Sequence, residues 1–107
     1  MTIEYLTRNK KNIAYSANAG GAFTLVFLGG FMSDMMGSKA THLEDWAKKN
    51  HYGFLRFDYS GHGQSSGVFE SCNISDWVED TYEIITEKTT GPIILIGSSM
   101  GGWISFL

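Results

Sequence analysis

Short hydrophobic runs separated by polar segments predict a mixed α/β domain. The expected strands are residues 2–7, 13–17, 23–28, 53–58 and 93–96. The first two alternate apolar and polar positions around a polar turn at residues 8–12, which indicates an antiparallel hairpin. Residues 23–28 and 93–96 are apolar enough to be covered on both faces, as in the interior of a parallel sheet.

Helical spacing occupies the segments between these strands. Ser38 is the expected N-cap of a first helix that ends near Asn50. Its inward face is predicted to comprise Ala40, Leu43, Trp46 and Ala47. Because this helix connects strands 23–28 and 53–58, the two strands are expected to be parallel, with a right-handed crossover.

A second helix is expected to start at a cap, Asn73 or Ser75, and to continue to about Lys88. Its predicted inward residues are Ile74, Trp77, Val78, Thr81, Ile84 and Ile85. Its acidic residues are expected on a solvated face; they are Asp76, Glu79, Asp80, Glu83 and Glu87. A further helix is expected to begin near Trp103.

A Gly-x-Ser-x-Gly motif directly follows the last strand, with Gly97, Ser99 and Gly101 in its fixed positions. Such a sharp strand-to-helix turn strains the backbone of the middle serine and requires small residues two positions before and after it. The two glycines satisfy this requirement for Ser99, whereas large residues flank Ser98. Ser99 is therefore the candidate nucleophile, and Ser98 is expected to pack or hydrogen-bond beneath it. The alternative is a glycine-rich turn without chemistry.

Gly29 and Gly30 end the central strand and allow a backbone N–H to turn toward a ligand. Acyl-transfer enzymes hold the developing oxyanion with two such N–H groups. We expect one from Met100, which follows the candidate nucleophile, and one from Phe31, with Met32 as second choice. Alternatively, the glycines only turn the chain and the apolar residues of the loop belong to the core. Methionines also suit an apolar acyl pocket, so Met32 is a candidate substrate contact.

The segment after strand 53–58 carries three glycines and a histidine. The spacing of Gly61, Gly63 and Gly67 is one residue too long for a dinucleotide-binding fingerprint, and no helix is expected to follow. His62 is a candidate base, but the simpler interpretation is a loop histidine whose hydrogen bonds shape the turn. The other two histidines, His42 and His51, are expected to be solvated.

Composition narrows the function classes. The chain has 107 residues, a net charge of -3 and a pI near 5.5, which disfavours a nucleic-acid surface. Its one cysteine, Cys72, excludes an internal disulfide, and no His, Cys, Asp or Glu cluster has metal-ligand spacing, so neither metal nor cofactor is expected. No apolar run reaches the roughly 18 residues of a membrane span, and no signal peptide is evident. A cytoplasmic location is expected.

Three ordered motifs, at residues 29–35, 56–65 and 97–103, resemble the α/β-hydrolase superfamily. Within it, the chain is most similar to bacterial esterases akin to a mitochondrial palmitoyl-protein thioesterase. The resemblance covers residues 2–107 and implies a serine hydrolase of ester or thioester bonds in small-molecule or acylated substrates. It also implies that Ser99 is the nucleophile and that Phe31 and Met100 are the oxyanion donors.

In this superfamily the catalytic acid and histidine follow the serine in the chain. The eight residues after Ser99 contain no Asp, Glu or His. We therefore expect residues 1–107 to be a single incomplete α/β-hydrolase domain, truncated after the nucleophile elbow and impaired in hydrolysis. The alternative is a non-catalytic fragment or half of a split hydrolase that acts as a pairing module. The implied fold lacks a strand beside residues 93–96, so self-association through this exposed edge is expected.

Overall fold

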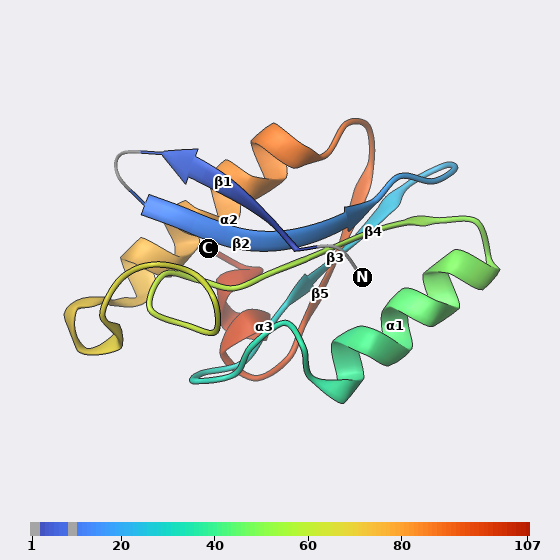
Figure 1. Cartoon of the computed structure of the whole chain (residues 1–107). Helices are drawn as coiled ribbons and strands as arrows, with labels where there is room; N and C mark the ends of the chain where they lie inside the picture. Colours follow the sequence, from blue (N-terminus) through green and yellow to red (C-terminus); the bar gives the residue numbers. More distant parts are fainter. Residues whose placement is uncertain (1–2, 9–10) are drawn as a thin grey trace.

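A computed structural model of the chain describes residues 3–8 and 11–107 as one mixed sheet with helices on both faces (Figure 1). The strands are β1 (Glu4–Arg8), β2 (Lys11–Asn18), β3 (Thr24–Leu28), β4 (Gly53–Phe57) and β5 (Ile93–Gly97). The helices are α1 (Ser38–Lys49), α2 (Ile74–Lys88) and α3 (Met100–Ile104), and η1 (Phe69–Ser71) is a short 3-10 turn. The expected α/β fold is confirmed: an antiparallel hairpin is followed by parallel strands with crossover helices.

The strand order is β1-β2-β4-β3-β5. β1 and β2 form the predicted antiparallel hairpin, and β2 pairs antiparallel with β4. β3 is parallel to both β4 and β5, so the predicted parallel crossover and the central position of β3 are confirmed. The first expected strand began at Thr2 and the expected hairpin turn included residues 9–10; these positions lie outside the described residues.

Two apolar layers follow from the alternation of side chains along β3. Leu25 and Phe27 pack on one side with Ala40 and Ala47 of α1. Val26 and Leu28 pack on the other side with α2 and α3. Figure 1 shows α1 apart from the pair α2 and α3, with the sheet between them. No helix in the described part of the chain is long and apolar enough to cross a membrane.

Helix α1 departs from its prediction at both its cap and its inward face. Ser38 is the first helical residue rather than the N-cap; Gly37 occupies the cap position, without a side-chain hydrogen bond. Trp46, expected to face inward, is 48% exposed and packs near Tyr52. The buried position is instead Glu44, which pairs with the buried Arg56 of β4 at 3.0 Å. A charge pair thus occupies a buried position that was not among the predicted inward residues of this helix.

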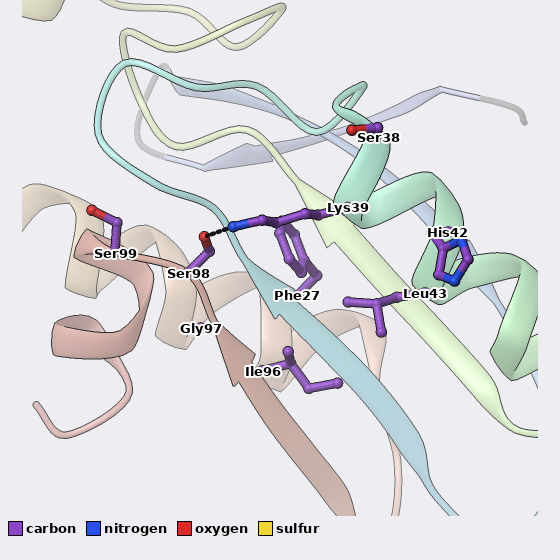
Figure 2. Close-up of a pocket in the computed structure, with 9 residues that line it drawn as sticks. All are labelled: Phe27, Ser38, Lys39, His42, Leu43, Ile96, Gly97, Ser98 and Ser99. Atoms are coloured by element: carbon purple, nitrogen blue, oxygen red, sulfur yellow. Dashed lines mark hydrogen bonds between the residues drawn. The ribbon is translucent and has the colours of Figure 1, made fainter.

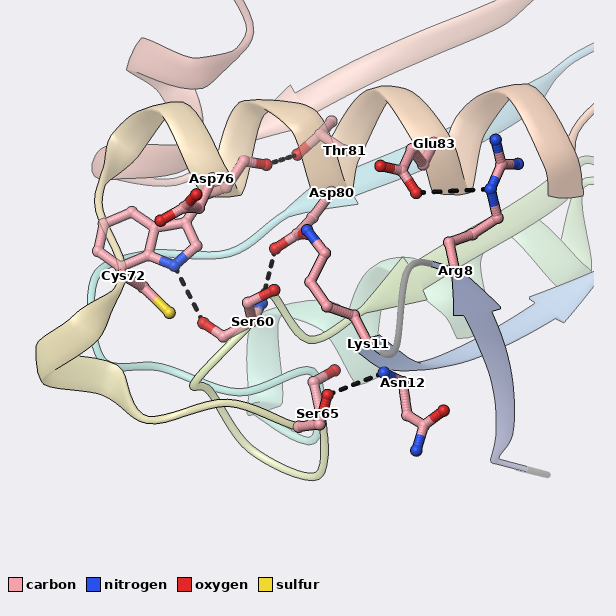
Figure 3. Close-up of polar contacts among 12 residues, drawn as sticks. Arg8, Lys11, Asn12, Ser60, Ser65, Cys72, Asp76, Asp80, Thr81 and Glu83 are labelled. Carbon is pink, nitrogen blue, oxygen red and sulfur yellow. Dashed lines mark hydrogen bonds and ion pairs between the residues drawn. The ribbon is translucent and has the colours of Figure 1, made fainter.

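Helix α2 begins as expected, because Asn73 and Asp76 form a reciprocal capping box. The prediction for Asp80 is wrong, since this carboxylate is 1% exposed. It accepts hydrogen bonds from Lys11 Nζ at 2.9 Å and from the backbone N–H of Ser60 at 2.7 Å. Figure 3 shows Asp80 between these two partners. It therefore joins α2 to β2 and to the loop after β4.

Candidate active site

The candidate nucleophile lies at the turn between β5 and α3. Ser99 has φ 57° and ψ −116°, in the left-handed range of φ that L-residues rarely adopt. The sequence predicts such angles for the middle residue of the motif. Helix α3 starts immediately afterwards, at Met100, which is earlier than the expected start near Trp103. The turn leaves Ser99 exposed to solvent.

Two glycines make this turn sterically possible. A Cβ on Gly101 would lie 1.9 Å from the Leu28 carbonyl oxygen, and a Cβ on Gly97 would lie 2.4 Å from the Gly102 nitrogen. Both contacts are with backbone, which cannot rotate away. A Cβ on Gly102 would meet nothing closer than 3.8 Å. The requirement for small residues therefore applies to the two motif positions and not to the third glycine.

The two adjacent serines have different surroundings. Ser98 Oγ accepts a hydrogen bond from Lys39 Nζ at 3.2 Å, while the Ser98 N–H continues the parallel ladder to the Leu28 carbonyl at 3.0 Å. Figure 2 shows the Ser98 side chain directed toward Lys39 and the Ser99 side chain directed away from it. Ser98 thus has the hydrogen-bonding position expected of it, and Ser99 points outward.

The loop between β3 and α1 lies against the Ser99 turn. A Cβ on Gly30 would be 3.5 Å from Ser99 Cβ. The next amide, Phe31 N–H, forms no hydrogen bond within residues 3–8 and 11–107. Met32 N–H is already used, because it donates to His62 Nε2 at 3.1 Å. Of the two candidates in this loop, only Phe31 has an available amide.

The second candidate donor, Met100, is the first residue of α3. The amides of a first helical turn have no intrahelical partner. In the part of the chain that the structure describes, the Met100 N–H has no acceptor. The N–H groups of Met100 and Phe31 thus belong to two segments that meet at Ser99.

The loop after β3 is tied to the end of β4 by several hydrogen bonds. Asp58 Oδ1 accepts from Met35 N–H at 2.7 Å, Arg56 donates to the Met35 carbonyl at 3.1 Å, and the Tyr59 hydroxyl donates to the Gly29 carbonyl at 2.9 Å. Burial raises the pKa of Asp58, and backbone N–H groups of Gln64 and Met35 oppose this rise. Spacing alone did not single out Asp58; the available signal was an acid at the end of a buried strand.

An open groove of about 740 Å³ adjoins the two serines (Figure 2). Phe27, Leu43 and Ile96 form its apolar wall, with Lys39 and His42 on α1. The methionines expected to line an acyl pocket are not part of this groove. Met35 is 1% exposed in the core, while Met32 and Met36 are 69% and 50% exposed.

A general base is not in contact with the candidate nucleophile. No side chain of residues 3–8 or 11–107 forms a hydrogen bond with Ser99 Oγ. His62 is 3% exposed and bonded to the loop after β3, as the simpler interpretation of this histidine predicted. His42 and His51 are exposed, as expected. The described residues therefore supply a serine and two amides but no proton acceptor for the serine.

Comparison with models of protein families identifies the family of the chain. The model of the serine aminopeptidase S33 family matches residues 23–107. The chain belongs to this family of α/β hydrolases. Relatives of the chain include proteins named as a palmitoyl-protein thioesterase and as putative esterase/lipases.

Among individual proteins, the chain is 40% identical over 106 residues to the mitochondrial palmitoyl-protein thioesterase ABHD10 of Bos taurus. That match covers 98% of this chain and 35% of the relative. The solved structure of mouse α/β hydrolase domain-containing protein 10 superimposes with a TM-score of 0.95 at 37% identity, over 98% of this chain and 42% of that one. The chain thus spans little more than a third of the curated relatives it matches.

More distant structures support the fold alone. The Est1E protein of Butyrivibrio proteoclasticus has a TM-score of 0.86 at 18% identity, over 97% of this chain and 45% of that one.

The expectation of a cytoplasmic location is wrong, because the mammalian relatives at 38–40% identity are named as mitochondrial proteins. The absence of an evident leader was too weak a basis for a location.

Proposed function

We propose that the chain carries the nucleophile of a serine hydrolase that cleaves carboxylic ester or thioester bonds through an acyl-enzyme on Ser99. One observation supports this most strongly. Ser99 is an exposed serine with φ 57° at the strand-to-helix turn. The amides of Phe31 and Met100, which have no acceptor among the described residues, lie in the two segments that meet there. In this proposal they are the oxyanion donors for the carbonyl that Ser99 attacks.

The proposed reaction has two steps. A general base removes the Ser99 proton while Oγ attacks the carbonyl carbon, and the negative oxygen is held by the N–H groups of Phe31 and Met100. The alcohol or thiol leaves with the proton, and an ester bond to Ser99 remains. Water then attacks this ester and releases the acid. This chain matches about a third of its relatives' length. We propose that the base and its acidic partner belong to a segment that corresponds to the unmatched part of the relatives.

The relatives also suggest a substrate class. Several are named palmitoyl-protein thioesterases, so acyl thioesters are the first substrates to assay. Met32, exposed on the loop after β3, is proposed as a contact for the acyl chain. Its flexible thioether side chain suits an apolar chain of variable length.

The test joins the chain to the segment of a relative that it does not span. Residues 1–107 are joined to the part of mouse ABHD10 that follows its matched segment, and hydrolysis of an aryl ester and an acyl thioester is measured. We expect turnover that Ser99→Ala abolishes and the neighbouring Ser98→Ala retains. A folded hybrid that is inactive, or whose activity survives Ser99→Ala, contradicts the proposal.

A second candidate function, a pairing module, is favoured by the sheet edge. β5 pairs only with β3 among the described strands. Its outer edge therefore offers free N–H and C=O groups on a strand without charge. Ile94 and Leu95 on this strand are 45% and 38% exposed. We infer that two copies associate through β5.

Light scattering after size exclusion tests this pairing at several concentrations. We expect dimers or larger species that increase with concentration, and a shift toward monomer in Ile94→Lys, which puts a charge on the edge. Thr86→Lys adds the same charge on the exposed surface of α2 and serves as the control. A wild-type chain that stays monomeric at all concentrations rules out this function.

A further inference from the structure

His62 connects the loop after β4 to the loop that carries the candidate oxyanion amide. Its ring is 3% exposed. Nε2 lies 3.1 Å from the Met32 nitrogen, and Nδ1 lies 3.1 Å from the Ser60 carbonyl oxygen. Both distances are within hydrogen-bonding range, so both ring nitrogens are engaged.

The two partners determine which nitrogen carries the proton. A backbone N–H can only donate, so Nε2 must accept from Met32. A carbonyl oxygen can only accept, so Nδ1 must donate to Ser60. The arrangement is therefore satisfied by the neutral ring with its proton on Nδ1. Either a charged ring or the opposite tautomer would place two donors against each other at Met32.

The bonded amide is next to the amide that matters for catalysis. Met32 has φ 56°, a conformation that its side chain disfavours and that an outside contact must hold. Phe31 is the residue between this anchored position and Gly30, which lies against the Ser99 turn. The Phe31 ring also packs edge-on against Phe69 at 5.1 Å. Contacts of its ring and of the neighbouring residue thus restrict the position of Phe31.

We propose that His62, as the neutral Nδ1–H tautomer, is a positioning residue that holds the Phe31 amide in place for the oxyanion. This inference rests on the proposed serine hydrolase function. His62 touches neither substrate nor nucleophile in this account. It acts by accepting the Met32 N–H, which keeps that amide from competing for the oxyanion and fixes the loop.

A proton on Nε2 of His62 is incompatible with the hydrogen bond that this nitrogen accepts from the Met32 N–H. The groups around His62 are the rings of Tyr59, Phe69 and Trp77, and Asp34 lines the same cavity of about 160 Å³. The nearby Asp58 carboxylate also interacts electrostatically with the ring. When the ring gains a proton on Nε2, its hydrogen bond with Met32 is lost.

The first measurement needs no catalysis. Long-range proton–nitrogen NMR correlations of His62 in the 107-residue chain report its tautomer, and the amide signals of Phe31 and Met32 are followed against pH. We expect the neutral ring to carry its proton on Nδ1, and both amide signals to show a step if acid adds a proton to Nε2. In His62→Gln, whose side-chain oxygen accepts in place of Nε2, this step disappears. Any step that remains there comes from a group other than His62.

The second measurement is kinetic and uses the hybrid with mouse ABHD10. His62→Leu removes the acceptor, and we expect kcat to fall by about 10- to 100-fold, less than the 10²–10³ of deleting an oxyanion donor. KM should change little, because the ground-state carbonyl depends less on this amide. His62→Gln should restore most of kcat.

The outcomes separate this inference from the proposed function. The Nε2–H tautomer, or an unchanged Phe31 amide signal and kcat in His62→Leu, overturns the role of His62. If His62→Leu does not fold, the wild-type tautomer and His62→Gln decide the matter. Activity that survives Ser99→Ala overturns the proposed function instead, and leaves the tautomer measurement intact.

Discussion

Met35 N–H donates a hydrogen bond of 2.7 Å to Asp58 Oδ1, and this bond links the loop after β3 to the end of β4. Both residues are buried, at 1% and 2% exposure. Asp58 Oδ2 accepts a second bond, from Gln64 N–H at 2.9 Å. One carboxylate thus holds two loops together below the candidate site. The free energy of unfolding is therefore expected to depend on whether Asp58 is ionised.

Stability should depend on pH through Asp58. Burial raises its folded pKa above the ordinary value of 3.8, so between these two pKa values the folded chain binds more protons than the unfolded one. Its contribution to the free energy of unfolding should be largest below the ordinary pKa and should be lost as pH rises through the folded pKa. Denaturation at several pH values, with Asp58→Asn as the reference, isolates this step. A difference that grows with rising pH contradicts the assignment.

Replacement of Asp80 should destabilise the fold far more than replacement of its neighbour. Asp80→Ala leaves the Lys11 ammonium and the buried Ser60 N–H without their partner, so we expect a loss of about 3 kcal/mol or more. Glu79→Ala, on the exposed side of the same helical turn, should stay within about 0.5 kcal/mol. Urea denaturation measures both. Equal effects would mean that the Asp80 contacts contribute little.

The three glycines near the elbow should respond differently to alanine. Gly101→Ala and Gly97→Ala drive a methyl group into backbone, and we expect losses of at least about 1–3 kcal/mol. Gly102→Ala has room and lies in helix α3, so it should be neutral or stabilising by up to about 1 kcal/mol. Thermal and urea unfolding of the three variants provide the comparison. A strongly destabilised Gly102→Ala would show that the turn is tighter than described.

The 107-residue chain alone should be a very poor esterase. Within its described residues no base contacts Ser99, so we expect aryl-ester hydrolysis about 10⁴–10⁶ slower than in the active hybrid with mouse ABHD10. Steady-state rates of the two proteins test this. Robust turnover by the short chain, abolished by Ser99→Ala, would require a base among its own histidines.

The sheet was predictable because apolar runs and turn residues are local features. The unbroken run at residues 93–96 correctly indicated β5. The strand–helix–strand order correctly gave the parallel pairing of β3 with β4. The steric requirement for Gly97 and Gly101 also followed from the motif alone. Boundaries shifted by a few residues, as at α3, because helix starts depend on the geometry of the preceding turn.

The errors concern polar groups that tertiary contacts bury. Periodicity assigned Asp80 to the solvated face of α2 because it could not foresee Lys11 and Ser60 as partners from other elements. The spacing also could not distinguish Glu44 from exposed charges, because its partner Arg56 lies on another element. Trp46 was expected to face inward, but it is exposed. The bond between His62 and Met32 joins two loops 30 positions apart in the chain. Such pairings become visible only once the strand order is known.

The central claim, that Ser99 is the nucleophile, is tested most directly by locating the acyl group. The hybrid with mouse ABHD10 is mixed with an acyl thioester, quenched with acid and digested, and the acylated residue is identified by mass spectrometry. The account predicts an acyl ester on Ser99 that is absent in Ser99→Ala and present in Ser98→Ala. An acyl group on Ser98, or on any residue outside the turn between β5 and α3, would contradict it.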